Sequence, residues 1–309
     1  MMMDFIDAAE LARRVSMAAA IDALDRAFGA GALPETPPRT HLSVASGDLL
    51  LMPAAGATGA GVKLVTVNPA NLARGLPLIH GLYVLFAPES LAPVAVIDGA
   101  ALTTLRTAAV SGLATRYLAH AVAHRLVIFG AGTQARAHLD AMRAVRPITR
   151  VRVVSRTPDK ARWLVEQARA LGLDADVAGP DIVAEADIVC ACTTSPTPLF
   201  DGALLPEGAH VNAVGAYTPA TRELDDATVR RGRLVVETRE AALAEAGDLI
   251  IPLQAGVIAR SDIVADLSEV VRGVAAPRAL ADIMVFKSVG VAFEDLAVAA
   301  IAVAAIAVD

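Results

Sequence analysis

Two glycines and a small residue at fixed spacing form the most informative motif of the chain. Gly130, Gly132 and Ala135 follow the apolar run Leu126–Phe129 and open a segment with helical spacing. The first glycine permits a tight turn, the second lets a pyrophosphate approach the backbone, and the small third residue lets the helix pack on the sheet. In this context the motif predicts a dinucleotide-binding loop, and the alternative is a plain tight turn.

The residues at the end of the next strand indicate which dinucleotide binds. An NAD site has an acidic residue there for the ribose 2′-hydroxyl. This chain has Ser155, Arg156 and Thr157 instead, so a guanidinium can pair with a 2′-phosphate and two hydroxyls can add hydrogen bonds. Asp159 follows and could cap the next helix. NADP(H) is therefore favoured, and NAD(H) is the alternative.

A third group of polar residues follows the apolar runs Ile188–Cys192 and Val211–Val214. Ligands of open α/β sheets lie at the carboxyl ends of strands, so these loops are candidates for the rest of the cofactor site. Ordinary loop residues would look the same. The candidate cofactor-binding residues from these patterns are Gly130, Gly132, Thr133, Gln134, Ala135, Ser155, Arg156, Thr157, Thr193, Thr194, Val214 and Gly215.

Three cations stand in apolar or strand-like contexts of the N-terminal half: Arg39, Lys63 and Arg106. A strand lysine commonly extends along the sheet to water, and an arginine early in a helix commonly forms an ion pair. Together the three could instead hold a small carboxylate, because they complement its charge and geometry. Spacing alone does not show whether they converge.

Two kinds of element must position these residues. An amphipathic helix over Ile6–Phe28 leads to short β-type runs between His41 and Ile97, which predict a mostly antiparallel sheet, and then to a helix over Ala100–His120. After Arg125, strands and helices alternate as in βαβ units.

The predicted fold class is therefore α/β, with a Rossmann-type doubly wound parallel sheet and a separate α+β domain. The Rossmann domain covers residues 120–290, and the α+β domain covers residues 1–119. A final helix over Phe293–Val308, within residues 291–309, returns to the α+β domain.

Composition argues against several other classes. The 309 residues carry a net charge of −6 and only 4% aromatics, which disfavours nucleic acid as a partner. Cys190 and Cys192 have no companions that complete a zinc site, so no metal is expected, and a reducing cytoplasm suits them. No basic-then-apolar leader is present, and the apolar run Leu296–Val308 is shorter than the ~20 residues that span a bilayer. We therefore expect a cytoplasmic protein without a membrane segment.

The ordered set of motifs resembles the ornithine cyclodeaminase/μ-crystallin family over nearly the whole chain. Besides the glycine loop, the motifs that carry the resemblance are Leu51-Met52-Pro53, Gly61-Val62-Lys63, Asn68-Pro69, Gly75-Leu76-Pro77, Asp98-Gly99, Thr104-x-Arg106-Thr107, Pro219, Glu223-Leu224, Lys287-Ser288-Val289-Gly290 and Glu294-Asp295-Leu296.

The resemblance implies a homodimer whose α+β domain binds substrate and dimerises. It also implies that Arg39, Lys63 and Arg106 contact the carboxylate region of the substrate. On the same basis we assign Met52 to the substrate site and Ser288 to the cofactor site.

Two departures separate the branches of this family, which include ornithine cyclodeaminases, an archaeal-type alanine dehydrogenase and reductases of cyclic ketimines. Cyclodeaminases have an acid where this chain has Leu50, and an Asp within a Gly-x-Asp-x-Pro loop where this chain has Gly215-Ala216-Tyr217-Thr218-Pro219. Those acids suit a diamine, whereas Leu50 and Tyr217 suit a ring with one nitrogen and an apolar body. The departures favour NAD(P)H-dependent reduction of Δ1-pyrroline-2-carboxylate or Δ1-piperideine-2-carboxylate, a small cyclic imino acid, to proline or pipecolate.

In the reaction that the resemblance implies, Lys63 and Arg106 are the catalytic residues. Arg106, helped by Arg39, grips the carboxylate, and Lys63 orients it and donates or relays a proton to the ring imine while NADPH delivers hydride to C2. Tyr217 either hydrogen-bonds the nitrogen or lines the pocket. The alternatives are an ornithine cyclodeaminase, an alanine dehydrogenase or, from another class, a μ-crystallin-like NADPH-binding protein with little turnover.

Overall fold

The computed structural model describes residues 3–275 and 278–304, and the chain divides into two compact units. We call residues up to 106 together with those from 291 on the mixed-sheet unit, and residues 107–290 the parallel-sheet unit. Each unit has its own sheet.

The chain passes from the first unit to the second within helix α3 (Gly99–Leu118), whereas the sequence analysis places a boundary after residue 119. The side chains of the second half of α3 explain the difference. The Nε2 atom of His138 lies 3.0 Å from Ser111 Oγ, and Asn212 Nδ2 donates to Thr115 Oγ1 at 2.9 Å. This half of α3 therefore belongs to the core of the parallel-sheet unit.

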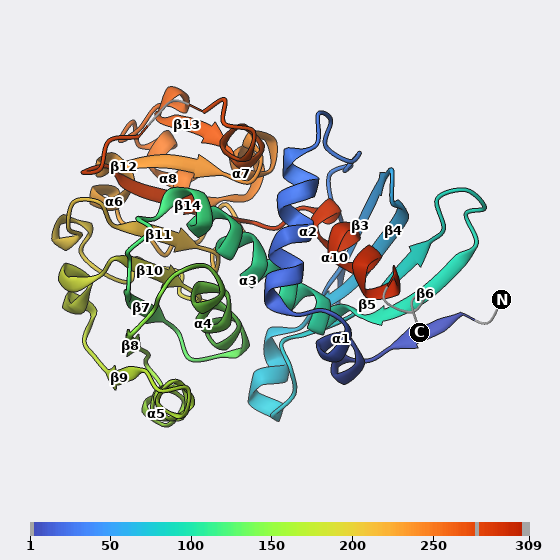
Figure 1. Cartoon of the computed structure of the whole chain (residues 1–309), viewed down its shortest axis with the longest axis horizontal. Coiled ribbons are helices and arrows are strands. Elements are labelled where there is room, and N and C mark those ends of the chain that lie inside the picture. Colours follow the sequence, from blue (N-terminus) through green and yellow to red (C-terminus); the bar gives the residue numbers. More distant parts are fainter. Residues whose placement is uncertain (1–2, 276–277, 305–309) are drawn as a thin grey trace. The chain divides into compact units, whose positions relative to one another are not determined.

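The mixed-sheet unit is built on a six-stranded sheet in the order β1-β6-β5-β4-β3-β2 (Figure 1). Strand β1 pairs parallel with β6, and the other neighbours pair antiparallel, as predicted for most of this sheet. The strands are β1 (Asp4–Ile6), β2 (Thr40–Val44), β3 (Gly47–Gly56), β4 (Gly59–Val67), β5 (Ile79–Phe86) and β6 (Pro93–Asp98), with a short 3-10 helix, Pro69–Arg74, between β4 and β5.

The helix that spacing predicts over Ile6–Phe28 is in fact two helices, α1 (Ala8–Arg14) and α2 (Met17–Gly29). The cause is Ser16, whose side chain accepts a hydrogen bond from Ala19 N at 3.2 Å and so caps the second helix. Serine is also tolerated inside helices, so the apolar spacing did not reveal this break.

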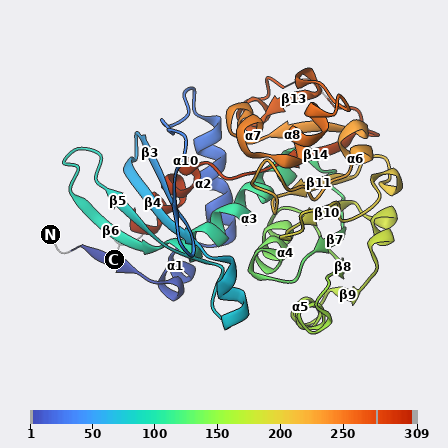
Figure 2. The same ribbon diagram turned by 180° about the vertical axis from the view of Figure 1, so that it is seen from behind.

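The last helix, α10 (Ala292–Ala304), packs on strands β3, β4 and β5 and against α2 (Figure 2). The rings of Phe28 and Phe293 meet edge to face with centroids 4.9 Å apart. The predicted return of the C-terminal helix to the first domain is thus observed, and its predicted end at Val308 lies outside the described residues. This packing brings the start of α10 to strand β4.

The parallel-sheet unit contains an eight-stranded, wholly parallel sheet in the order β13-β12-β14-β11-β10-β7-β8-β9 (Figure 1). The strands are β7 (Arg125–Phe129), β8 (Arg150–Val154), β9 (Asp174–Val177), β10 (Ile188–Ala191), β11 (His210–Ala213), β12 (Gly232–Val236), β13 (Ile263–Asp266) and β14 (Ile283–Lys287). The strand order reverses between β7 and β10, as in dinucleotide-binding folds, and the predicted α/β class is confirmed. The short outer strands β9 and β13 were not predicted.

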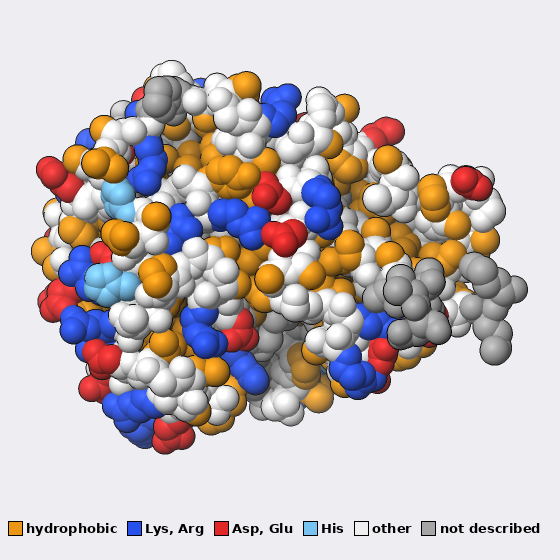
Figure 3. Space-filling model, viewed as in Figure 1, with side chains coloured by type: hydrophobic (Ala, Val, Ile, Leu, Met, Phe, Trp, Pro, Cys, Tyr) orange, Lys and Arg blue, Asp and Glu red, His pale blue; other side chains and the backbone are white. Residues whose placement is uncertain are grey.

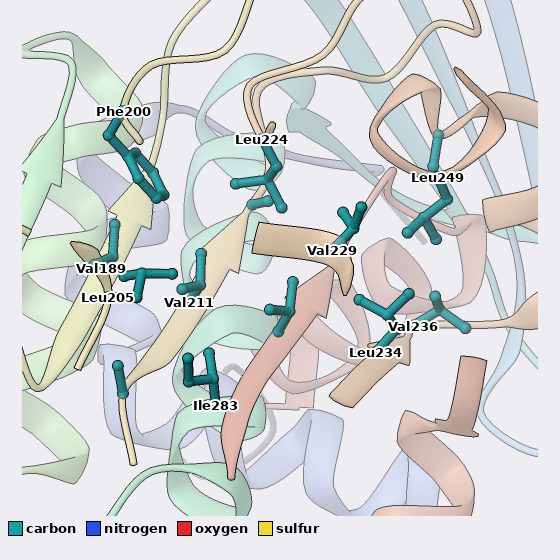
Figure 4. Close-up of a cluster of buried hydrophobic side chains, with 14 of the residues drawn as sticks. Val189, Phe200, Leu205, Val211, Leu224, Val229, Leu234, Val236, Leu249 and Ile283 are labelled. Atoms are coloured by element: carbon teal, nitrogen blue, oxygen red, sulfur yellow. The ribbon is translucent and has the colours of Figure 1, made fainter. Parts of the chain in front are cut away.

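Both faces of the central strands β10, β11 and β14 are buried. One face carries a cluster of apolar side chains that includes Val189, Val211 and Leu234, covered by Leu224 and Leu249 from outside the sheet (Figure 4). Alternate residues of the same strands point to the other face, where α3 and α4 pack. The remaining helices are α4 (Thr133–Val145), α5 (Pro158–Ala170), α6 (Asp226–Arg231), α7 (Arg239–Glu245), α8 (Gly247–Gln254) and α9 (Leu267–Val271), with 3-10 turns at Pro180–Glu185, Gly202–Leu204 and Arg260–Asp262.

The surface combines charges of both signs. On the face in Figure 3, the basic and acidic side chains of the described residues are interspersed among apolar ones. Within the described parts of the chain, no helix is long and apolar enough to cross a membrane.

Candidate active site

The glycine loop after β7 has the geometry that a pyrophosphate needs. Gly130 has a φ of +102°, and a Cβ there would lie 2.6 Å from the carbonyl oxygen of Cys192. Gly132 is the N-cap of α4 and makes no side-chain cap hydrogen bond, and a Cβ added to it would meet no atom within 4 Å. The start of α4 therefore offers open space beside unsatisfied N–H groups, which suits a phosphate.

The neighbouring side chains agree with this fit. Ala135 is fully buried against the sheet, as the motif requires. Gln134 Oε1 is buried without a hydrogen-bond partner among the described residues, and Thr133 is exposed at the first position of α4. This amide oxygen is an acceptor, so it suits a hydroxyl group of a ligand, such as a ribose hydroxyl, whereas the N–H groups at the start of α4 suit the phosphates. The residues present therefore fit a dinucleotide.

The cation that follows β8, Arg156, is accessible to solvent. Arg156 is exposed and forms no hydrogen bond or ion pair with any other described residue, while Ser155 Oγ accepts a hydrogen bond from Thr157 N at 3.2 Å. Asp159 does not cap α5; it lies in the first turn and pairs with Arg162. The guanidinium is therefore available for an anion such as a 2′-phosphate.

The loops after β10 and β11 are held together by a residue that the sequence analysis did not assign. Thr193 and Gly215 both donate backbone hydrogen bonds to the carboxylate of Glu223. Val214 is half-buried and Thr194 is exposed. Both loops thus lie at the carboxyl ends of neighbouring strands, as predicted.

Ser288 follows β14 at the same edge of the sheet but is buried. Its Oγ donates to Glu237 Oε1 at 2.5 Å, and the other carboxylate oxygen accepts from the Val289 and Gly290 N–H groups. The structure gives this hydroxyl a role in fixing the loop, and its contact with a cofactor stays a prediction. Tyr217 also belongs to the parallel-sheet unit and is exposed, so its predicted contact with substrate stays a prediction too.

The predicted carboxylate-binding cations do converge in the mixed-sheet unit. Lys63 on β4 and Arg106 on α3 both reach the start of α10, where they meet two acids. Lys63 Nζ lies 2.8 Å from Asp295 Oδ2, and Arg106 Nη1 lies 2.9 Å from Glu294 Oε2. Arg106 Nε lies 3.4 Å from Asp295 Oδ1. The cluster is almost fully buried: Lys63 is 1% exposed, Arg106 5%, and both acids 0%.

Two strand neighbours complete the surroundings of Lys63. Met52 on β3 and Tyr83 on β5 stand directly opposite it in the sheet, and both are buried. The Tyr83 hydroxyl has no hydrogen-bond partner among the described residues. Arg39 is half-buried and close enough for its charge to act on Lys63.

Burial and neighbouring charges set the proton affinity of this cluster. Burial lowers the pKa of Lys63 to about 8, the positive charge of Arg106 adds to the effect, and the Asp295 carboxylate opposes it. Burial and the Asp295 charge raise the pKa of Tyr83 far above its usual value. Lys63 therefore carries a proton near neutral pH that it can give up at modest cost, whereas Tyr83 keeps its proton.

Glu294 and Asp295 were predicted only as part of a family motif, without a role of their own. Their context contained a usable clue. Two adjacent acids begin an otherwise apolar helix, and carboxylates are rarely buried without a cationic partner.

The described residues hold no group of three or more His, Cys, Asp or Glu side chains that could bind a metal ion.

Comparisons with known proteins agree with this geometry. The model of the ornithine cyclodeaminase/mu-crystallin family matches residues 1–306. A Δ1-pyrroline-2-carboxylate reductase of Bacillus cereus (strain ZK / E33L) is 39% identical over 273 residues, which cover 85% of this chain and 84% of that protein.

Two solved structures superpose over almost the whole chain. The Thermococcus litoralis Δ1-pyrroline-2-carboxylate reductase in complex with NADH and L-proline has a TM-score of 0.93 at 35% identity, covering 98% of this chain and 97% of its own. An archaeal alanine dehydrogenase dimer with bound NAD has a TM-score of 0.94 at 31% identity, covering 99% and 96%. The whole-length match and these relatives lead to one conclusion: the chain belongs to the ornithine cyclodeaminase/mu-crystallin family.

Proposed function

We propose that this protein, a nicotinamide-dependent oxidoreductase acting on C=N bonds, reduces a cyclic ketimine carboxylate. The substrate is Δ1-pyrroline-2-carboxylate, Δ1-piperideine-2-carboxylate or both, and the product is L-proline or L-pipecolate. The observation that carries this proposal is the buried cluster in which Lys63 and Arg106 converge. The similarity to Δ1-pyrroline-2-carboxylate reductases supports it.

In the proposed reaction, Arg106 binds the substrate carboxylate with help from Arg39. A guanidinium matches a carboxylate in shape and charge, and burial strengthens the attraction. Glu294 and Asp295 hold Arg106 in place before substrate arrives, so little side-chain freedom is lost on binding.

Lys63 supplies the proton that the ring nitrogen takes up as the C=N bond becomes C–N. Its pKa of about 8 leaves it protonated at neutral pH and makes it a better acid than an exposed lysine. A bound nicotinamide supplies the hydride that reaches C2. The proton and the hydride together account for the two hydrogens gained by the product.

The surroundings favour a ring over a diamine. Leu50, at the position where cyclodeaminases carry an acid, is only 5% exposed on β3 and offers no charge to an amino group. The two acids of this region, Glu294 and Asp295, already pair with Arg106 and Lys63, so the second amino group of a diamine would meet no additional acid at Leu50. A cyclic imino acid brings one carboxylate and an apolar ring.

The assay that tests the proposal follows NADPH and NADH oxidation by absorbance with both ketimines. We expect Lys63→Ala to lower kcat by about 10²-fold or more, and Arg106→Ala chiefly to raise KM. Arg13→Ala, which removes an exposed arginine that pairs with Glu10, serves as the matched control and keeps wild-type rates.

Other outcomes would replace the proposal with a different function. Reduction of pyruvate with ammonia would identify an alanine dehydrogenase, a candidate supported by the superposition on that archaeal enzyme. Proline formed from ornithine with NAD would identify a cyclodeaminase. Tight NADPH binding without turnover of any of these substrates would identify a binding protein.

We also propose that NADP(H) is the preferred cofactor, because Arg156 is exposed and unpaired among the described residues at the end of β8. Arg156→Ala should raise KM for NADPH about tenfold, the usual effect of losing a charged hydrogen bond, and leave KM for NADH unchanged. Equal effects on both cofactors would contradict this preference.

A homodimer is the proposed assembly. The resemblance implies it, and the archaeal alanine dehydrogenase structure is of a dimer. Light scattering of the pure protein should then give about twice the chain mass of 31.8 kDa.

A further inference from the structure

Three buried charges connect the carboxyl ends of adjacent strands in the parallel-sheet unit. Glu223, which follows β11, is 0% exposed. Its Oε1 accepts hydrogen bonds from Thr193 N at 2.8 Å and Thr193 Oγ1 at 2.6 Å, and its Oε2 accepts from Gly215 N at 2.6 Å. One carboxylate therefore binds the loops that leave β10 and β11.

Glu223 is itself held by a second buried acid. Asp248 Oδ1 accepts from Glu223 N at 2.7 Å and from Leu224 N at 2.8 Å, while Asp248 Oδ2 pairs with Lys287 Nζ at 2.8 Å. Lys287 ends β14, the strand next to β11. The carboxylate of Glu223 thus has little freedom to move.

The two loops lie unusually close together. A Cβ on Gly215 would overlap the carbonyl oxygen of Thr193 and would lie 2.6 Å from Glu223 Oε1. Only glycine allows this approach, and the N–H groups of both loops donate to the one carboxylate of Glu223. A carboxylate is suited to this task because each of its oxygens accepts strong hydrogen bonds.

The position of the loops says which part of a ligand they would meet. A dinucleotide crosses the carboxyl edge of such a sheet where the strand order reverses, here between β7 and β10. The adenosine half of a bound dinucleotide would then lie on the β8 side, beside Arg156, and the nicotinamide half would extend over β10 and β11.

We propose that Glu223 is a positioning residue for the nicotinamide half of the cofactor, because it fixes the backbone of Thr193 and Gly215 where that half must lie. This inference rests on the proposed nicotinamide-dependent function. It assigns no proton transfer to Glu223, which is fully buried behind the two loops.

The test compares whole cofactors with fragments that lack nicotinamide. Calorimetry would measure the Kd of NADPH and of 2′-phospho-ADP-ribose, and of NADH and ADP-ribose, for the full-length wild-type protein and for Glu223→Gln. The amide keeps the shape of the side chain but presents one NH2 group, which cannot accept from a loop N–H. We expect a Kd for NADPH or NADH raised about tenfold or more and a Kd for the matching fragment changed less than about twofold.

Asp187→Asn is the matched control. Asp187 lies at the opposite, amino-terminal edge of the same sheet, where its Oδ2 accepts from His124 N and Arg125 N, both at 2.9 Å. Weakening these two hydrogen bonds should lower the free energy of unfolding while leaving the Kd values of cofactor and fragment unchanged. Any general loosening of the sheet would show in this variant too.

The outcomes separate the two proposals. If wild-type protein binds neither cofactor nor fragment, the proposed function fails. If it binds both and Glu223→Gln weakens both equally or neither, only the role of Glu223 is overturned. Should Glu223→Gln not fold, Glu223→Asp keeps the charge beside Lys287 but shortens the reach, and the same selective loss of nicotinamide affinity is expected.

Discussion

At the scale of single residues, the chemistry of Lys63 depends on what surrounds it. Lys63 faces Arg106 from α3, Asp295 from α10, Tyr83 from β5 and the charge of Arg39, all within the mixed-sheet unit. Burial and the two arginines favour loss of the proton, and Asp295 alone among these groups favours keeping it.

Asp295→Asn should therefore move the pH profile of the enzyme. Removal of the carboxylate lowers the pKa of Lys63 further below about 8, so the protonated form is lost at lower pH. The alkaline limb of kcat/KM, which reports the free enzyme, should shift toward acid. The measurement is kcat/KM for the ketimine between pH 6 and 10.

Glu294→Gln provides the comparison for that profile. Glu294 pairs with Arg106, and it is not among the groups that shift the pKa of Lys63. Its loss should therefore raise KM for the ketimine while the alkaline limb of kcat/KM stays at its wild-type pH. A limb that does not move in Asp295→Asn would exclude Lys63 as the group that titrates there.

At the scale of elements, the loop between β7 and α4 contains two glycines with different roles. One is required by the backbone conformation, and the other by the space that a ligand needs. Gly130 has a positive φ and no room for a Cβ, whereas Gly132 has a φ of −94° and open space around it. The first glycine serves the backbone, and the second leaves room for a ligand.

Substitution of each glycine by alanine should reveal this difference. Gly130→Ala should lower stability by about 1–2 kcal/mol or more, because a left-handed conformation and a clash with Cys192 are both imposed. Gly132→Ala should leave stability within about 0.5 kcal/mol. Both should weaken NADPH binding. Thermal unfolding and calorimetry measure the two effects, and tight NADPH binding by Gly132→Ala would contradict the pyrophosphate assignment.

At the scale of the whole molecule, two buried histidines make stability depend on pH. Burial lowers the pKa of His138 to about 4 and that of His210 to about 3. Unfolded chains bind a proton at these residues below about pH 6.5, while the folded protein does not until far lower pH. The free energy of unfolding should thus fall from pH 6.5 toward pH 4, by up to about 1.4 kcal/mol per pH unit for each histidine.

Urea unfolding at pH 7.5, 6 and 5 measures this dependence. His138→Gln should make it less steep, and the exposed His41→Gln should leave it as in wild type. A slope unaffected by His138→Gln would assign the acid sensitivity to other groups.

The features that could be predicted from the sequence are those that depend on local patterns of residues. The glycine loop, the alternation of strands and helices after Arg125 and the end of β8 at Val154 each follow from residues that are neighbours in the chain. Such patterns are reliable because backbone conformation depends mainly on nearby side chains. Even so, the helix break at Ser16 was missed. The apolar spacing of this segment fits one long helix as well as two short ones, and it does not reveal the capping hydrogen bond at Ser16.

Only the tertiary structure decided where the charges meet. Lys63 and Asp295 lie 232 positions apart, and Arg106 and Glu294 lie 188 apart, so no spacing rule links them. Their pairing depends on α10 returning to pack on β4, and the sharing of Glu223 by two loops depends on β10 and β11 lying side by side. Buried charges need partners, and which partner each finds is set by the packing of elements distant in the chain.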